Sequence, residues 1–413
     1  MTSLLPTQNL QKKFSENTLA IEAWFEQQWK KISPPIYCSV DLRNANFKLA
    51  PIDTNLFPAG FNNLNPMTMP LCGQAAKQII QRFCSRAKRL LLVPENHTRN
   101  LFYLESVAAL QNIFIQAGFS VRIGSLNGDV IDPQIITLPS NNTITLEAVH
   151  RCNDRIVIKG FDPDLIILNN DLSSGIPPQL HNIAQPIYPP LHSGWASRLK
   201  SIHFQTYQIV AAEFAEIIAL DPWLIAPLFR NCHEIDFMKR EGEDCVIKNT
   251  DLLLHAIQAK YNAYNIQQKP FVVVKADAGT YGMAVMMVHS TDELRQLNRK
   301  QRTRMSTSKG GSSVSKVIVQ EGVYSFETVN TEKTVAEPVI YMIGQQVVGG
   351  FYRAHTERNS HENLNAPGMH FEPFPTENTK TTDQLFYAYS VVARLALLSA
   401  AQEMSLPTVG TAL

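Results

Sequence analysis

The segment from residue 89 to 123 alternates between strand and helix patterns, and it restricts the possible folds more than any other part of the sequence. Leu90–Val93 is a short apolar run typical of a buried strand, and a helix is predicted from about Leu101 to Ala117, ending at Gly118. Phe119–Ile123 is the next apolar run, and residues 164–168 repeat the design. Strands joined through a helix lie parallel in one sheet. The sequence therefore predicts an α/β fold with ligands at the carboxyl ends of its parallel strands.

The overall charge of the chain excludes some classes of partner. Its 413 residues are enough for two or three domains. The 37 basic and 36 acidic side chains leave a net charge of +1, which argues against capture of nucleic acid or of an anionic membrane. Six cysteines are scattered without a C-x-x-C pair, which argues against a disulfide framework or a zinc site. We therefore expect no nucleic-acid or membrane partner.

The apolar segments of the chain predict a cytoplasmic protein. The N-terminal stretch lacks an apolar core of signal-peptide length. Leu385–Ala401 is the most apolar segment, but Arg394 stands in its middle, and a charge there is costly at the centre of a bilayer. We interpret this segment as a buried helix. The sequence leaves the oligomeric state open.

Changes of pattern divide the chain into three parts. Residues 1–70 hold a helix with Ile21, Phe25 and Trp29 on one face, followed by two short strands at 36–42 and 47–52. Residues 63–70 form a turn-rich stretch with two prolines. Residues 71–240 carry the parallel α/β pattern, and residues 241–413 are expected to form a second module.

A lysine followed by a glycine loop is the sharpest chemical motif. An apolar strand, 271–274, ends at Lys275, a loop contains Gly279 and Gly282, and a second strand returns. The lysine can place a charge against a phosphate, and the glycines allow backbone N–H groups to approach it. The motif is neither a Walker loop nor a dinucleotide fingerprint. On its own, such a glycine hairpin is more often structural.

The strands that follow give this motif a context. Lys316–Val323 is a strand that carries Glu321 near its end. Two apolar runs around Gly344 predict a hairpin that delivers Arg353, and a polar loop follows at 360–368. Four stretches carry a resemblance: V-K-A-D-A-G-T-Y-G-M, V-I-V-Q-E-G-V, D-T-N-L-F-P-A-G-F-N-N and E-N-L-N-A-P-G. Together they resemble a bacterial glutamate–cysteine ligase family with an ATP-grasp-like architecture, from about residue 20 to 400.

The resemblance implies a reaction and a set of ligands. It implies ATP-dependent coupling of the γ-carboxylate of L-glutamate to L-cysteine through an acyl phosphate, the first step of glutathione synthesis. ATP, glutamate, cysteine and Mg²⁺ are then the expected ligands. Two alternatives remain open: another ATP-grasp ligase such as a glutathione synthetase, and a non-catalytic nucleotide-binding protein.

The expected magnesium ligands lie in an unusual place. ATP-grasp enzymes usually carry an acid, followed by an acid-x-Asn, after the lid module, whereas this chain is mostly helical after residue 373. The same pattern occurs near the N-terminus as Asp41, Asp53 and Asn55. Alternation along a strand puts Asp53 and Asn55 on one face. We therefore expect a metal site there and a circularly permuted ATP-grasp fold. The alternative is an Asx turn at residues 53–55.

The resemblance and the loop positions assign the remaining site residues. Lys275 and Arg353 are the expected catalytic residues, at the phosphates. The expected ATP-binding residues are Lys275, Asp277, Gly279, Thr280, Tyr281, Gly282, Gln320, Glu321, Val323, Asn363 and Asn365. The expected substrate-binding residues are Asn62, Asn63, Glu95, His97, Arg99, Asn170 and Arg198. Solvated turns, and for Arg198 a basic helix start, are the structural alternatives. Residues 299–316, with six basic and no acidic side chains, form either a solvated loop or a cover over the triphosphate.

Overall fold

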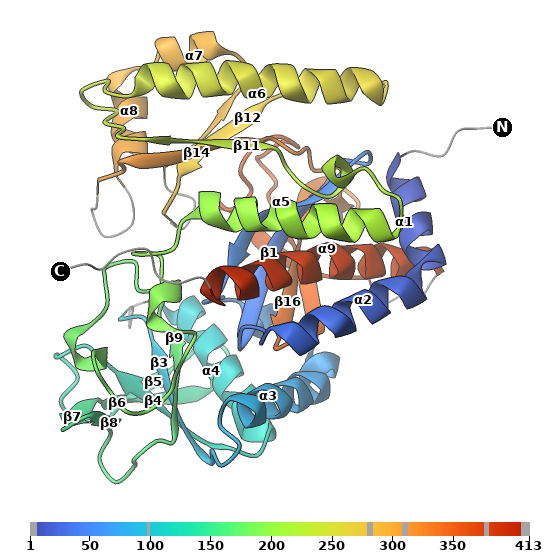
Figure 1. The fold of residues 1–413 in the computed structure, drawn as a ribbon. Coiled ribbons are helices and arrows are strands. Elements are labelled where there is room, and N and C mark those ends of the chain that lie inside the picture. Colours follow the sequence, from blue (N-terminus) through green and yellow to red (C-terminus); the bar gives the residue numbers. More distant parts are fainter. Residues whose placement is uncertain (1–5, 97–99, 279–283, 308–312, 376–379, 406–413) are drawn as a thin grey trace.

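The computed structural model describes residues 6–96, 100–278, 284–307, 313–375 and 380–405. In this part of the chain the fold is mixed α/β, with a central sheet, a parallel sheet and a smaller antiparallel sheet (Figure 1). The expected α/β class is confirmed.

The central sheet combines the two ends of the sequence. Its main path runs β18-β17-β16-β1-β2, with every neighbouring pair antiparallel, and the short β15 also pairs with β16. The strands are β1 (Tyr37–Asn44), β2 (Leu49–Asn55), β15 (Thr328–Val329), β16 (Thr334–Ile343), β17 (Gln346–Ala354) and β18 (His370–Pro373). The N-terminal strand pair thus extends a sheet built by C-terminal strands.

Helices cover one face of this sheet. They are α1 (Pro6–Glu16), α2 (Thr18–Lys31), α5 (Lys200–Ile217) and α9 (Lys380–Ser405). Helix α9 contacts β1, β2 and β16, and in Figure 1 the helices lie in front of the sheet. Val40 and Leu42 of β1 point into the core that these helices form. Because side chains alternate along a strand, Asp41 and Arg43 leave the opposite face.

Helix α9 contains the apolar segment predicted to be buried. By length and composition it could cross a membrane, but 72% of its most apolar window is buried inside the protein. Arg394 pairs with Glu22 of α2, with N···O distances of 2.7 Å. The helix therefore serves as the core of the fold, as expected.

The parallel sheet follows the strand–helix–strand prediction. Its order is β10-β9-β3-β4-β6-β5, parallel except for the edge pair β5–β6. Its strands are β3 (Arg89–Pro94), β4 (Ser120–Ser125), β5 (Gln134–Thr137), β6 (Thr143–Ala148), β9 (Leu165–Asn169) and β10 (Ile187–Tyr188). A separate two-stranded ribbon consists of β7 (His150–Cys152) and β8 (Arg155–Val157). Helix α4 (Leu101–Gln116) ends before Gly118, whose φ of +94° suits glycine.

Helix α3 (Met69–Phe83) begins inside the stretch of residues 63–70 that was predicted to be turn-rich. Pro70 stands in its first turn, where a proline needs no hydrogen-bond donor, so this proline begins a helix instead of preventing one.

The antiparallel sheet has the order β11-β14-β12-β13. Its strands are β11 (Phe229–His233), β12 (Val272–Ala276), β13 (Val285–Val288) and β14 (Lys316–Glu321), and its helices are α6 (Glu243–Ala263), α7 (Thr291–Arg295) and α8 (Arg299–Ser306). The sheet takes in β11, which precedes the expected boundary at residue 240. The first eight residues of the basic run at 299–316 form helix α8, which begins with a capping box between Asn298 and Gln301.

A buried ion pair joins the central and antiparallel sheets. Lys48, in the turn between β1 and β2, lies 2.7 Å from a carboxylate oxygen of Glu321 on β14, and both side chains are almost fully buried. This ion pair thus holds the β1–β2 turn against β14. The two sheets enclose the site described next.

Candidate active site

A cavity lies between the central and antiparallel sheets. It encloses about 730 Å³ of empty space, open solvent at its mouth included. The predicted residues that line it are Asp41, Asp53, Lys275, Gln320, Glu321, Val323, Arg353, Asn363 and Asn365. The N-terminal acids and the late lysine strand, more than two hundred residues apart in sequence, therefore face one space.

Carboxylates line the wall formed by the central sheet. Asp41 of β1 and Asp53 of β2 are register partners, so both side chains leave the same face. Arg353 holds Asp41 at 2.7 Å and Glu337 at 2.8 Å, and Glu337 also pairs with Arg43 at 2.9 Å. The wall is thus a row of alternating acids and arginines.

The two aspartates differ in their electrostatic surroundings. Burial raises the pKa of the Asp41 carboxyl above its usual value, against the attraction of Arg353. Burial alone would also raise the pKa of Asp53, but the ammonium groups of Lys200 and Lys275 outweigh it and hold that pKa low. Asp53 is therefore an anion at neutral pH.

Lys275 stands on the opposite wall, on β12. Its Nζ donates to the carbonyl of Ile52 at 2.8 Å. Burial, and then the nearby charge of Lys200, lowers the pKa of Lys275 to about 7. On the neighbouring strand, Gln320 is 2% exposed, and its Nε2 has no hydrogen-bond partner among the residues that the structure describes. An unpaired buried donor on a cavity wall is expected where a ligand supplies the acceptor.

Glu321 was expected among the ATP-binding residues, but protein groups engage its carboxylate. Its carboxylate accepts hydrogen bonds from Lys48, from the indole of Trp223 at 3.1 Å and from the backbone N–H of Leu228 at 2.8 Å. With these donors the carboxylate joins the two sheets, although the residue still lines the cavity.

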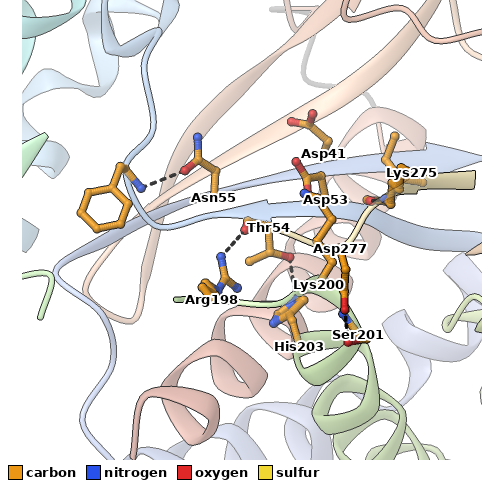
Figure 2. Close-up of polar contacts among 12 residues, drawn as sticks. Asp41, Asp53, Thr54, Asn55, Arg198, Lys200, Ser201, His203, Lys275 and Asp277 are labelled. Carbon is orange, nitrogen blue, oxygen red and sulfur yellow. Dashed lines mark hydrogen bonds and ion pairs between the residues drawn. The ribbon is translucent and has the colours of Figure 1, made fainter. Parts of the chain in front are cut away.

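Asp277 also has a structural role. It is fully buried, and its carboxylate accepts from the backbone N–H and the hydroxyl of Ser201, both at 2.7 Å (Figure 2). Its own carbonyl accepts from the N–H of Lys200 at 2.8 Å. Asp277 therefore fastens the end of β12 to the start of α5, and it does not line the cavity.

Arg198 does not reach the cavity either. Its guanidinium pairs with both carboxylate oxygens of Glu403 and donates to the carbonyl of Thr54 at 2.7 Å. His203 contacts the same two residues, at 3.1 Å and 2.9 Å. This buried network holds α5 and α9 against β2, which leaves the guanidinium of Arg198 engaged by protein groups.

The other expected substrate residues that the structure describes lie outside the cavity lining. Asn62 and Asn63 bond each other at 3.2 Å, Glu95 is buried after β3, and Asn170 accepts from the N–H of Leu172 at 3.0 Å. The remaining predicted residues lie outside the described part of the chain: His97, Arg99, Gly279, Thr280, Tyr281 and Gly282.

Two carboxylates suit a hard cation, but the part of the chain that the structure describes offers no complete cage. The oxygens of Asp41 and Asp53 are the ligand type that Mg²⁺ prefers, and Mg²⁺ commonly takes one or two carboxylates together with phosphates and water. Within the described ranges no three His, Cys, Asp or Glu side chains converge on one point. Asn55 does not line the cavity, and its Oδ1 accepts from the N–H of Phe57 at 2.9 Å (Figure 2). This contact is an Asx turn at residues 55–57, whereas residues 53–55, where the sequence left an Asx turn as the alternative, belong to strand β2.

Sequence reasoning missed Arg43, Lys200 and Glu337, which also line the cavity. Strand alternation gives a signal for Arg43, which lies two residues after Asp41. The cluster of basic residues before α5 led us to expect Arg198 at the site, but Lys200 lines the cavity instead. Nothing local marks Glu337, whose position depends on the pairing of β16 with β17.

Comparisons with known proteins bear on the family of the chain. The chain matches a family model described as glutamate-cysteine ligase over residues 11–404. Among solved structures it is similar to a protein from Methylobacillus flagellatus KT, provisionally named gamma-glutamylcysteine synthetase. The TM-score is 0.90 at 52% sequence identity, covering 98% of this chain and 97% of that one. A glutathione synthetase-like effector from Globodera pallida gives a TM-score of 0.37 at 9% identity, over 88% of this chain and 82% of that one, and carries no argument. No match was found among curated proteins.

A family match over nearly the whole chain defines an ATP-dependent ligase. The chain belongs to the glutamate–cysteine ligase family, and it joins glutamate to cysteine in the synthesis of glutathione. This confirms the resemblance found in the sequence.

Proposed function

We propose that the cavity binds Mg²⁺–ATP in an ATP-grasp-like arrangement, between the central and antiparallel sheets. The observation that carries this proposal is that Asp53 of β2 and Lys275 of β12 line one cavity. Acids on one wall suit the cation, and the lysine on the other suits the phosphates.

The nucleobase occupies the end of the cavity near Gln320. The unpaired Nε2 of Gln320 donates to a ring acceptor, and apolar side chains such as Met287 and Val323 contact the faces of the base. Asn363 and Asn365 add polar groups at the rim. Glu321 lines this end of the cavity, but its carboxylate already accepts hydrogen bonds from protein groups and is not assigned to the nucleotide.

The phosphates lie between Lys275 and Arg353, and Asp41 and Asp53 hold Mg²⁺. When bound, this cation would neutralise part of the negative charge of the phosphates. The γ-carboxylate of glutamate attacks the terminal phosphorus of ATP to give an acyl phosphate and ADP, and the amine of cysteine then displaces phosphate. The side chains position the reactants and neutralise charge, so no protein nucleophile is required.

The order of the strands supports a circular permutation of the ATP-grasp fold. The strands that carry the proposed metal ligands, β1 and β2, come first in sequence, but β1 pairs with the late strand β16. We propose that residues 1–70 complete the nucleotide-binding module of residues 241–413. The amino acids then bind toward residues 71–240, where Glu95, His97, Arg99 and Asn170 remain candidates, together with Asn62 and Asn63 just before this segment. We also propose that the protein works in the cytoplasm.

A phosphate-release assay tests the reaction, with glutamate, cysteine, ATP and Mg²⁺ each omitted in turn. We expect release that requires all four, with γ-glutamylcysteine as the product. Release that requires γ-glutamylcysteine and glycine would instead indicate a glutathione synthetase. Nucleotide binding without any release would indicate a non-catalytic protein.

A further inference from the structure

Lys200 lines the proposed active site, but the proposed function assigns it no ligand. It is the first residue of α5, and its Nζ lies 2.5 Å from Oδ1 of Asp53. The same Nζ lies 4.4 Å from the ring centroid of Trp195. The side chain of Lys200 is 8% exposed, whereas that of Asp53 is 38% exposed. A lysine thus covers one side of a carboxylate that remains open to the cavity.

The arginines of the cavity are held more firmly than this lysine. Arg43 pairs with Glu337 and donates to three backbone carbonyls, and Arg353 pairs with both Asp41 and Glu337. For Lys200, the hydrogen-bond acceptor that the described chain provides to the ammonium is Asp53. A lysine ammonium is a compact charge on a flexible stem, so it can exchange one oxygen partner for another.

The backbone of Lys200, by contrast, is fixed from two sides. Arg198 and His203 both contact Thr54, the residue after Asp53, from within the buried network beneath β2. Asp277 fastens Lys200 and Ser201 to the end of β12 (Figure 2). Helix α5 therefore starts at a fixed place between β2 and β12, and the side chain of Lys200 is the part that can move.

We propose that Lys200 is an exchangeable counter-ion that becomes a substrate-binding residue. In the ligand-free protein its ammonium neutralises Asp53. When the cation that arrives with the nucleotide takes this carboxylate, the ammonium turns to the amino-acid carboxylate that is to be activated. The inference rests on the proposed function, which gives Asp53 to the cation.

Charge and position both favour a carboxylate as the second partner. A nearly buried ammonium that loses its counter-ion carries a large desolvation cost, so an incoming anion is attracted to it. Lys275 already lies on the wall assigned to the nucleotide. Lys200 comes from α5, which belongs to neither of the two sheets that hold the nucleotide. We therefore assign it to the second reactant, which reacts with the nucleotide. The carboxylate of glutamate is that reactant.

The first test measures cation binding without nucleotide or turnover. Mn²⁺ is titrated into wild-type protein and into Lys200→Met, and free Mn²⁺ is followed by electron paramagnetic resonance. Because the competing ammonium is gone, Lys200→Met should bind Mn²⁺ about tenfold more tightly. Lys200→Arg, which keeps the charge, should bind Mn²⁺ no more tightly than wild type. Equal affinities for wild type and Lys200→Met would overturn the exchange.

Lys260→Met is the matched control. Lys260 pairs with Asp221 at 2.8 Å, and its Nζ lies 5.8 Å from the ring centroid of Trp223, so this trio resembles that of Lys200 but does not line the cavity. Its Mn²⁺ affinity should equal that of wild type. An increase as large as in Lys200→Met would show a non-specific effect of charge and contradict the proposal.

The second test separates the carboxylate from the phosphates. For Lys200→Met the KM for glutamate should rise about tenfold or more, while the KM for ATP changes less than about twofold. Lys200→Arg should restore part of the glutamate affinity. A rise confined to the KM for ATP would refute the assignment to the carboxylate. Activity of the wild-type protein with Mg²⁺–ATP would leave the proposed function standing in that case.

Discussion

Asp41 and Asp53 face each other across the antiparallel β1–β2 pair, and each is held by a cation from a distant part of the chain. Arg353 of β17 pairs with Asp41, and Lys200 of α5 pairs with Asp53. The cavity therefore already balances its acids with protein cations. A bound metal must compete with these cations, which makes the aspartates the first residues to test.

Replacing Asp53 should abolish turnover and leave the fold intact. We expect Asp53→Ala to lower kcat by about 10²-fold or more, because one of two carboxylates proposed for the cation is lost. Thermal unfolding followed by circular dichroism checks the fold. Asp164→Asn serves as a control, since Asp164 pairs with Arg89 away from the cavity. Full activity of Asp53→Ala would remove Asp53 from the metal site.

Gln320 should contribute to nucleotide binding more than to catalysis. Gln320→Leu removes the unpaired donor, and we expect the KM for ATP to rise about three- to tenfold with kcat almost unchanged. Thr250→Val is a matched control. The hydroxyl of Thr250 is also buried and has no partner within the described ranges, but it lies on α6, away from the cavity. An unchanged KM for ATP in Gln320→Leu would place the base elsewhere.

Lys275 should take up a proton when nucleotide binds. Its pKa is lowered to about 7 in the ligand-free protein, so at pH 8 the group is mostly neutral, and a neighbouring phosphate restores its charge. Nucleotide affinity should therefore fall as the pH rises above 7. Calorimetry in two buffers of different protonation enthalpy measures the uptake. Lys275→Arg should abolish it, since arginine stays protonated. The same uptake in that variant would point to another group.

The buried pair of Lys48 and Glu321 should matter for stability. Lys48→Met leaves a buried carboxylate without its counter-ion, and we expect the free energy of unfolding to fall by about 3–5 kcal/mol. The double variant Lys48→Met, Glu321→Gln should recover part of this loss because no charge remains. Chemical denaturation gives both values. A single variant as stable as wild type would show that the pair does not hold the sheets together.

Much of the fold follows from local patterns in the sequence. The strands around Leu90 and Lys275, helix α4 with its terminal Gly118, and the hairpin that carries Arg353 appear where periodicity and glycine positions predict them. The pairing of β1 with β16 depends on contacts between opposite ends of the chain, which no local pattern encodes. The order of the motifs and the resemblance to a family supplied the expectation that these ends meet.

The site was harder to predict than the fold. Acids such as Asp41 and Asp53 could be proposed because a strand alternates its faces. Glu321 and Arg198 have the residue types of a binding site, but buried partners occupy their charged groups. Whether a charged side chain faces a ligand or another element is decided by tertiary packing, and it therefore required the structure.

A crystal structure with Mn²⁺ and a non-hydrolysable ATP analogue tests the central claim most directly. Anomalous scattering locates the cation independently of the rest of the map. We predict a Mn²⁺ peak within about 2.5 Å of carboxylate oxygens of Asp41 and Asp53. The phosphates should contact Lys275, and the base should accept a hydrogen bond from Gln320. A nucleotide bound outside the space between the central and antiparallel sheets, with its cation away from both aspartates, would contradict the account.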